Sequence, residues 1–338
     1  MQFNEKIVAW YQQHGRKDLP WQQAKGVVKP YHVWLSEIML QQTQVVKVKD
    51  YFCRFITELP TLKQLAEADE QQVLSLWSGL GYYNRARNLH KAAQICAEEH
   101  QRQLPENLNA LMALPGIGRS TAAAIMSLAY SLPEPIMDGN VKRVFARHFL
   151  VDGEPNKSAT LKQFWELAEQ HKAHKNPAAY TQGLMDLGAM VCTKHQPQCE
   201  KCPISSSCLA KAKGVIANYP EKKRKVVQQE VDLYCLLHER ADQIAVELRT
   251  DNGIWSQLWF VPSFDSEQDL LKVADDAKHL FSLTHKLTHR ILQLHVYSST
   301  KIDNSKHQNW IKPAELKHKP HPKALEHIIT QYKNQHSI

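Results

Sequence analysis

The spacing of apolar residues divides the chain into two parts. Up to about residue 190, apolar positions recur every three to four residues, for example over residues 89–96 and 161–168. This period is typical of helices that bury one face. Prolines and short polar stretches interrupt the pattern at intervals. The first part is therefore expected to be nearly all helix.

Beyond residue 230 the period shortens to two. Apolar and polar residues alternate over Val231–Leu237, Ile244–Leu248 and Leu292–Val296, which predicts strands with one buried face. Helical spacing returns near Ser266–Leu280 and near Lys323–Lys333. The second part is therefore expected to be a domain of α+β type.

The length of 338 residues suits two domains at roughly 150 residues each. We expect a helical domain over residues 1–216 and an α+β domain over residues 230–338. Residues 217–229 between them are polar, carry a basic run and lack an apolar face, which predicts a linker. The same basic run would also suit contact with phosphate.

Composition narrows the class of protein. Apolar residues make up 43% of the chain and charged residues 22%, close to an ordinary globular protein and unlike a disordered one. The N-terminus lacks a signal-peptide core, and no apolar run is long enough to span a membrane. A soluble, cytoplasmic protein is expected. The formal net charge of +8 favours a polyanionic partner such as nucleic acid.

Four of the seven cysteines lie within seventeen residues, with the spacing Cys192-x6-Cys199-x2-Cys202-x5-Cys208. In a reducing compartment such a group indicates metal ligands before disulfides. Structural zinc sites usually use two close cysteine pairs, and only one is present here. The spacing therefore favours a [4Fe–4S] cluster, with zinc and a chance grouping as the alternatives. A bound cluster would also fix the shape of a lysine-bearing loop able to hold phosphates.

A second motif is the glycine-containing run Leu114–Thr121, which lies between helical patterns over residues 108–113 and 122–130. Gly116 and Gly118 allow a tight hairpin whose backbone N–H groups face outward at a helix start, and this geometry binds phosphate. The pattern is that of a helix-hairpin-helix over residues 108–130. Taken alone, it also fits an ordinary turn between helices.

Twenty residues after the hairpin, a proline-containing loop ends in Asp138-Gly139-Asn140 and leads into a helical run. Asp138 or Asn140 suits the cap of that helix, which alone would explain either residue. Hairpin, loop, aspartate and cysteine group nevertheless follow one another in the order found in a superfamily of DNA base-excision glycosylases.

The combined motifs resemble those of the MutY-type adenine DNA glycosylases of the endonuclease III, or helix-hairpin-helix, superfamily. The likeness covers nearly the whole chain and is carried by Val33–Thr43, Gly79–Leu89, the hairpin, Asp138–Val141 and the four cysteines. It implies a mainly α helix-hairpin-helix glycosylase domain with a [4Fe–4S] cluster loop over residues 192–208. It also implies an α+β MutT-like (Nudix-fold) C-terminal domain over residues 230–338.

The resemblance implies a base-excision repair enzyme that flips adenine out of the duplex and hydrolyses its N-glycosidic bond. The implied substrate is double-stranded DNA in which adenine is mispaired with 8-oxoguanine or guanine. A [4Fe–4S] cofactor, a monomer and no membrane partner are expected.

The resemblance also implies roles for three polar residues. Glu37 occupies the position of the acid that protonates adenine N7 and then activates water, although an ordinary glutamate on a helix would be solvated. Asp138 would stabilise the oxocarbenium-like sugar, as a carboxylate does in glycoside hydrolysis. Asn140 would position groups by hydrogen bonding.

Further residues match family positions that contact DNA or bases. Gln42 and Tyr82 match residues that wedge into the duplex beside the flipped base and the 8-oxoguanine. The implied DNA contacts also include Gly116, Gly118, Ser120 and Lys142, and the implied adenine pocket includes Trp21 and Gln182. The family loop that probes 8-oxoguanine, Phe-Ser-His, aligns with Leu287-Thr288-His289. Thr288 keeps the hydroxyl of the serine and His289 is retained, but the aromatic residue is lost.

Ser120 separates two branches of the superfamily. Endonuclease III-like enzymes carry a lysine there whose amine attacks the sugar, and serine cannot form that Schiff base. The resemblance therefore implies a monofunctional glycosylase. The alternatives are an endonuclease III-like bifunctional glycosylase for oxidised pyrimidines and an iron–sulfur DNA sensor without chemistry. A nucleotide hydrolase in the second domain would need an acidic metal-binding helix that Ser266–Leu280 lacks.

Overall fold

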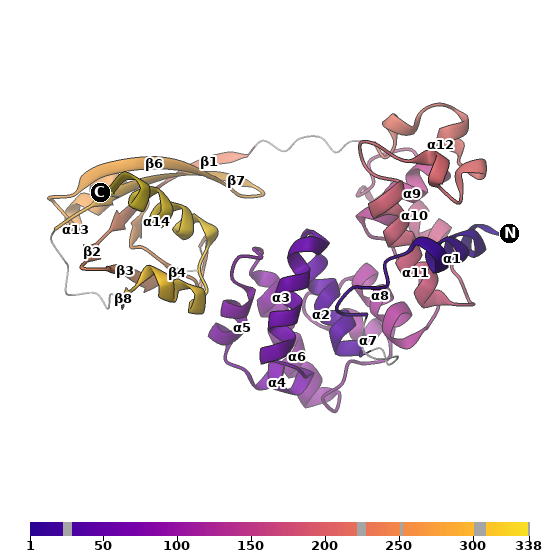
Figure 1. The fold of residues 1–338 in the computed structure, drawn as a ribbon, viewed down its shortest axis with the longest axis horizontal. Helices are drawn as coiled ribbons and strands as arrows, with labels where there is room; N and C mark the ends of the chain where they lie inside the picture. The colour runs from indigo at the N-terminus through magenta and orange to yellow at the C-terminus, as the bar shows by residue number, and fades with distance from the viewer. Residues whose placement is uncertain (23–28, 222–227, 251–252, 301–308, 337–338) are drawn as a thin grey trace. The chain divides into compact units, whose positions relative to one another are not determined.

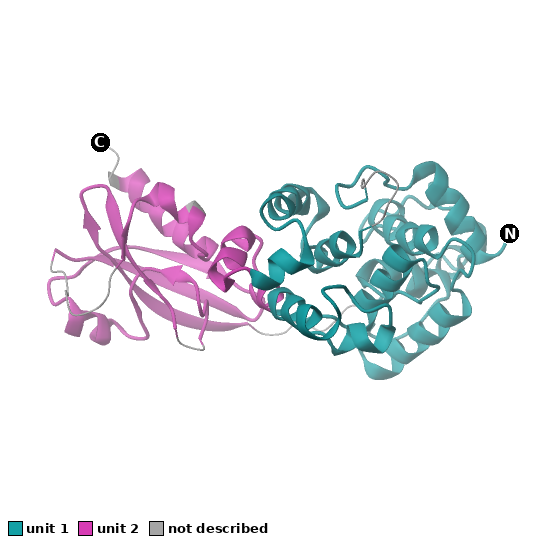
Figure 2. Ribbon diagram, turned by 90° about the horizontal axis from the view of Figure 1, so that it is seen from below, with its two compact units in different colours: residues 1–67, 88–224 teal, residues 68–87, 225–338 magenta. Residues whose placement is uncertain are grey.

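The computed structural model describes residues 1–22, 29–221, 228–250, 253–300 and 309–336 (Figure 1). The chain forms two compact units, coloured separately in Figure 2. The first contains residues 1–67 and 88–224, and the second contains residues 68–87 and 225–338. Residues 68–87 thus belong to the unit of the C-terminal domain, although their sequence position placed them in the helical domain. Of the expected linker, residues 222–227 lie outside the described residues.

The first unit is helical, as the apolar spacing predicts. Its helices are α1 (Phe3–His14), α2 (Pro30–Leu40), α3 (Val45–Glu58), α4 (Leu62–Glu67), most of α6 (Asn84–Glu99), α7 (Leu108–Ala113), α8 (Arg119–Tyr130), α9 (Gly139–His148), α10 (Ser158–Gln170) and α11 (Pro177–Asp186). A π-helical turn η1 (Leu187–Val191) continues α11 up to the first cysteine of the group. The short elements that follow are η2 (Cys199–Lys201), η3 (Ser205–Ser207), α12 (Leu209–Ala212) and η4 (Ile216–Asn218).

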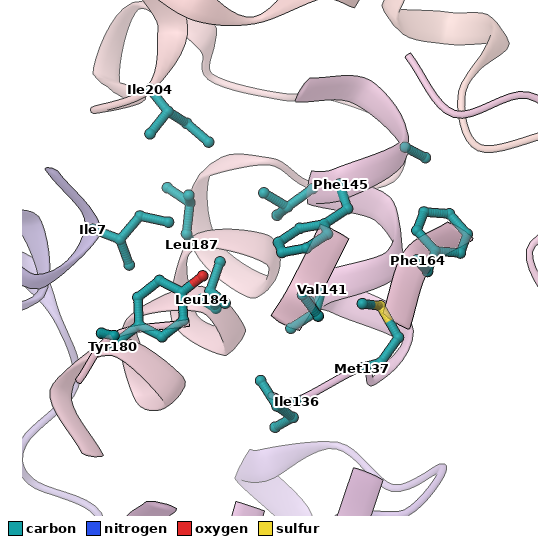
Figure 3. Packing of buried hydrophobic residues seen from close by; sticks show 14 of the residues in the cluster. Ile7, Ile136, Met137, Val141, Phe145, Phe164, Tyr180, Leu184, Leu187 and Ile204 are labelled. Carbon is teal, nitrogen blue, oxygen red and sulfur yellow. The ribbon is translucent and has the colours of Figure 1, made fainter. Parts of the chain in front are cut away.

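A hydrophobic core holds α9 and α11 together (Figure 3). Val141 and Phe145 of α9 are fully buried and belong to one cluster with Leu184 and Leu187. Ile7 of α1 joins the same cluster. Burying large apolar side chains stabilises a fold by about 1.5–3 kcal/mol each. The start of α9, which carries Asp138, is therefore fixed by packing and not by its loop alone.

The α7–α8 hairpin has the predicted geometry. Leu114 and Ile117 are buried, and the glycines between and after them are exposed. Gly116 has a φ of +78°, and a Cβ at this position would lie 2.8 Å from the Cβ of Asn88. A side chain is thus excluded by both backbone conformation and space. Gly118 is the N-cap residue of α8.

The second unit contains α5 (Glu70–Trp77) and the α+β domain. Its strands are β1 (Gln229–Leu237), β2 (Glu239–Arg240), β3 (Gln243–Leu248), β4 (Trp259–Phe260), β5 (Ser263–Phe264), β6 (Lys278–Lys286), β7 (Arg290–Ser298) and β8 (Asn309–Ile311). One sheet has the order β5-β1-β7-β6, with β1 and β7 parallel and the other pairs antiparallel. In the other sheet β3 pairs with β2, β4 and β8. The helices are α13 (Glu267–Val273), the 3-10 helix η5 (Pro313–His318) and α14 (Lys323–His336).

The alternation along β1 is explained by helices on both faces of the first sheet. Leu233, Cys235 and Leu237 lie in one cluster with four residues of α14, namely Ala324, Leu325, Ile328 and Ile329. Leu236 instead belongs to a cluster with Leu270 of α13. Successive side chains of a strand point to opposite faces, so each set meets its own helix.

The predicted helix over Ser266–Leu280 is only half right. Ser266 caps α13 through the backbone N–H of Asp269, but the helix ends at Val273 and Leu280 lies in β6. The carboxylate of Asp276 accepts bonds from the backbone N–H and the hydroxyl of Thr300 at 3.1 and 2.6 Å. These bonds tie the turn to the end of β7, and strand pairing with β7 then overrides the local helical spacing.

None of the helices in the described ranges combines the length and apolar character needed to cross a bilayer.

Candidate active site

Glu37 lies on α2 among apolar neighbours. Its side chain is half-buried, and the adjacent Trp34 and Ile38 are almost completely buried. Burial disfavours the charged form, and the negative charge of Asp138 adds to this effect, so the pKa of Glu37 is raised to about 8. A glutamate with this pKa holds a proton at neutral pH and can donate it, as a general acid must.

Asp138 is the N-cap residue of α9. Its carboxylate accepts a hydrogen bond from the backbone N–H of Val141 at 2.7 Å and from Nδ2 of Asn140 at 3.1 Å. The pKa of Asp138 is raised above its usual value, because burial outweighs these bonds and the charge of Arg143, which lower it. Donors to the carboxylate favour its ionised form. Glu37 shows no such donors among the causes of its raised pKa, so the two carboxyl groups lie in different electrostatic environments.

Arg143 connects the start of α9 to the cysteine loop. Its guanidinium donates to Oδ1 of Asn140 at 2.8 Å, to the carbonyl of Gly188 at 2.6 Å and to the carbonyl of Cys192 at 2.7 Å. A Cβ at Gly188 would lie 2.6 Å from the Cβ of Asn140, so the π-helical turn must carry glycine there. Sequence reasoning missed Arg143, because an arginine on a helix gives no signal of its partners.

Ser120 and Lys142 lie next to the loop that ends at Asp138. The hydroxyl of Ser120 accepts the backbone N–H of Met137 at 3.3 Å, one residue before Asp138. Lys142 is half-buried and donates to Oδ1 of Asn156 at 2.8 Å, and burial lowers its pKa while Asp138 raises it. Ser120 thus helps to hold the loop before Asp138 in place, a role that its predicted DNA contact did not include.

A pocket of about 290 Å³ opens in the same unit, at the lower end of the roughly 300–1,000 Å³ of small-molecule sites. Its lining includes both Trp21 and Gln182, the two residues assigned to an adenine pocket, together with Val33 and Ser36 of α2. Trp21 is buried and packs edge-to-face on Phe52 with ring centroids 5.4 Å apart. The helix that carries Glu37 therefore also forms a wall of the pocket.

Gln42 follows α2 in an unusual conformation. Its side chain is exposed and its φ is +57°, in the left-handed region that non-glycine residues rarely adopt. Val46 lies four residues later and is 81% exposed. An exposed apolar side chain beside a strained polar one suits contact with another molecule. Sequence reasoning did not single out Val46, whose valine fits the apolar pattern of α3.

The second unit brings together the residues assigned to the base opposite adenine. Tyr82 is 46% exposed with a φ of +53°, and its hydroxyl shares a 3.0 Å hydrogen bond with Oγ1 of Thr288. Thr288 and His289 are exposed at the turn between β6 and β7. Segments more than 200 residues apart in sequence therefore form one exposed surface.

The four cysteines line one cavity. Cys192, Cys199, Cys202 and Cys208 all contribute to its wall. Burial and the neighbouring thiols raise the pKa of Cys202 to about 11, and they also raise the pKa of Cys199. Within the described ranges, no three histidine, cysteine, aspartate or glutamate side chains converge as ligands of one metal ion. Four thiols that line one cavity are a donor set that both [4Fe–4S] clusters and zinc ions use.

Arg147 supports the cysteine loop from α9. It is 4% exposed, and its guanidinium donates to Sγ of Cys192 at 3.4 Å and to the carbonyls of Thr193 and Lys194 at 2.7 and 3.1 Å. A buried cation is costly unless its donors are paired, and here carbonyls satisfy them. The loop thus keeps its shape through α9, the helix that begins after Asp138 and carries Asn140.

Two family models match the chain. Residues 35–170 match the HhH-GPD superfamily base excision DNA repair protein, and residues 233–331 match the NUDIX domain. The chain is 34% identical to the adenine DNA glycosylase of Buchnera aphidicola subsp. Acyrthosiphon pisum, over 98% of this chain and 97% of that protein. It is 32% identical to the adenine DNA glycosylase of Homo sapiens, over 87% of this chain and 66% of that protein.

Solved structures with the same helical fold include a thermostable thymine-DNA glycosylase and endonuclease III in a non-covalent complex with DNA. The first has a TM-score of 0.55 and 29% identity, covering 62% of this chain and 95% of that one. The second has a TM-score of 0.52 and 20% identity, covering 62% of this chain and 94% of that one.

Proposed function

The chain belongs to the adenine DNA glycosylases of the HhH-GPD superfamily and is therefore a base-excision repair enzyme, and on this premise we propose that it hydrolyses the N-glycosidic bond of adenine paired with 8-oxoguanine or guanine. The observation that carries the proposal is the pairing of a protonated Glu37 with Asp138. Two carboxyl groups in different environments can divide acid and charge-stabilising roles between them.

Glu37 donates the proton that makes adenine a leaving group. Adenine flipped into the pocket receives this proton at N7, and the electron pair of the C1′–N9 bond then leaves with the base. The resulting Glu37 carboxylate accepts a proton from the water that attacks C1′. Because its pKa is about 8, Glu37 takes up a proton again at neutral pH.

Asp138 stabilises the positive charge that develops on the sugar. A preorganised carboxylate in a site with little water interacts strongly with an oxocarbenium-like transition state. The bonds from Val141 and Asn140 fix its orientation before substrate binds. Asn140 is thus a positioning residue, held in turn by Arg143.

The reaction stops at base removal. Ser120 stands where bifunctional relatives have a nucleophilic lysine, and its hydroxyl is engaged with the backbone of Met137. A hydroxyl cannot form a Schiff base with the sugar. Tyr82, Thr288 and His289 provide the surface that recognises the base opposite adenine.

A [4Fe–4S] cluster is the group that fits the cysteine cavity. Cys192, Cys199, Cys202 and Cys208 would hold it. When bound, its irons compensate the charge of four thiolates and cross-link the loop. Arg143 and Arg147 of α9 donate hydrogen bonds to carbonyls of this loop, so a loop fixed by the cluster would also fix the position of α9.

Single-turnover base release on matched duplexes tests the proposal. The duplexes carry adenine opposite 8-oxoguanine, adenine opposite guanine, or thymine glycol opposite adenine, and each is worked up with and without alkali. Adenine release with strand breaks only after alkali supports the proposal. Direct cleavage at thymine glycol would favour the bifunctional alternative, and no release from any duplex by iron-loaded protein would favour a DNA sensor without chemistry.

The rate of adenine release should fall as the pH rises through about 8. The acid works only while Glu37 is protonated, and its proton is lost above its pKa of about 8. Single-turnover rates with saturating enzyme should decline about tenfold per pH unit above this point. DNA binding measured over the same pH range serves as the control. A rate that rises steadily to pH 9.5 would contradict the acid role of Glu37.

Replacing Cys199 with serine should lower iron content and DNA affinity together. Loss of one thiolate ligand destabilises the cluster, and we expect DNA binding to weaken about 10- to 100-fold. Cys53→Ser is the matched control, because Cys53 is exposed and outside the cavity. Unchanged affinity in a protein without iron would rule out the structural role of the cluster.

A further inference from the structure

A buried ion pair lies behind the pocket that contains Trp21 and Gln182. The carboxylate of Asp186 has no solvent-exposed surface. It accepts hydrogen bonds from the backbone N–H of Arg16 at 2.8 Å and from Nε of the same arginine at 2.9 Å. The pKa of Tyr11, another residue of the pocket wall, is raised by the burial of Tyr11 itself and by the negative charge of Asp186. Such a pair is fixed in geometry, because breaking it would leave a buried charge without a partner.

The same carboxylate holds Gln182. Nε2 of Gln182 donates to Oδ1 of Asp186 at 2.9 Å, one helical turn away on α11. An ionised carboxylate only accepts hydrogen bonds, so it selects the NH₂ end of the amide. Oε1 of Gln182 accepts no hydrogen bond from the part of the chain that the structure describes, and Gln182 itself lines the pocket. The amide oxygen is therefore the acceptor available to a bound base.

We infer that the Arg16–Asp186 pair sets the base specificity of the pocket by holding the Gln182 amide with its oxygen toward the base. This inference rests on the proposed function, since it takes the pocket to hold the flipped adenine. Adenine carries an amino group at C6, which donates to such an oxygen. Hypoxanthine and guanine carry a carbonyl there, so that two acceptors would face each other with no hydrogen between them.

The cost of that mismatch is the source of discrimination. A buried polar group left without its partner costs about 1–3 kcal/mol. For a 6-oxopurine the amide would have to turn, and turning it would place its oxygen against the Asp186 carboxylate. Asp186 and Arg16 thus act through Gln182 as positioning residues and do not touch the base.

A double-mutant cycle separates this role from a merely structural one. Asp186→Asn supplies an amide that can bond either end of Gln182, and Gln182→Met removes the amide while keeping a similar length. Single-turnover release is measured for adenine and hypoxanthine opposite 8-oxoguanine, in wild type, both single variants and the double variant. Gln163→Met, at an exposed position on α10, is the matched control.

We expect Asp186→Asn to lower the adenine-to-hypoxanthine rate ratio about tenfold or more, and to have no effect on that ratio when Gln182 is already methionine. A purely structural role would slow both bases alike in both backgrounds and leave the ratio unchanged, which would overturn the inference. Should Asp186→Asn not fold, Arg16→Lys, which retains the charge, replaces it in the same cycle. Wild-type protein that releases no adenine would contradict the proposed function itself, so the two failures are distinguishable.

Discussion

Replacing Glu37 with glutamine should abolish adenine release while leaving DNA binding intact. Glutamine keeps the size of the side chain but cannot donate a carboxylic proton to N7. General acid catalysis contributes about 10²–10⁴-fold to a rate, and Glu37 also activates the water, so we expect a loss of about 10⁴-fold or more. Single-turnover release and a binding titration on the same duplex, with adenine opposite 8-oxoguanine, measure both quantities.

The same variant has an expected effect on stability that serves as an internal control. The folded protein keeps the Glu37 proton up to about pH 8, whereas an unperturbed glutamate loses it near 4.5. Between these values the folded state binds more protons, so the free energy of unfolding falls as the pH rises. Glu37→Gln should remove this decline and be at least as stable as wild type at pH 8.

A Glu37→Gln variant that releases adenine at the wild-type rate would refute the acid assignment.

Much of the fold could be predicted from local patterns. The helical spacing identified the first unit, and the Gly116 hairpin has the expected shape because its left-handed φ and tight contact depend on a residue type visible in sequence. The two-residue period located β1, β3 and β7. The helix after Ser266 failed beyond Val273, because pairing of β6 with β7 and the bonds of Asp276 are long-range contacts that the local spacing does not encode.

The candidate site was predictable to a different degree. Glu37, Asp138 and the four cysteines followed from motifs shared with a family, and the structure supplies the burial behind their chemistry. The partners of these groups were not predictable. Arg143 bridges Asn140 and Cys192 across about 50 residues of sequence, and Arg16 reaches Asp186 across 170. Neither arginine has a local pattern that distinguishes it from a surface arginine.

Replacing Asp138 with asparagine should slow adenine release about 10³-fold without unfolding the protein. Asparagine caps a helix as well as aspartate does, so α9 should keep its start and the midpoint of thermal unfolding should change by a few degrees at most. The charge that stabilises the sugar is lost, and removing one preorganised electrostatic group from a transition state typically costs 10²–10³-fold. Single-turnover release and thermal unfolding measure the two effects.

The pH profile of the Asp138→Asn variant distinguishes loss of the charge from a displaced loop. The negative charge of Asp138 contributes to the raised pKa of Glu37, so removing it should move the high-pH decline of the residual rate below pH 8. A displaced loop would instead change DNA affinity and thermal stability, with no defined shift in the profile. If the decline stays at pH 8 while the rate is lost, the two carboxyl groups are not electrostatically coupled, and the division of roles between Glu37 and Asp138 would have to be abandoned.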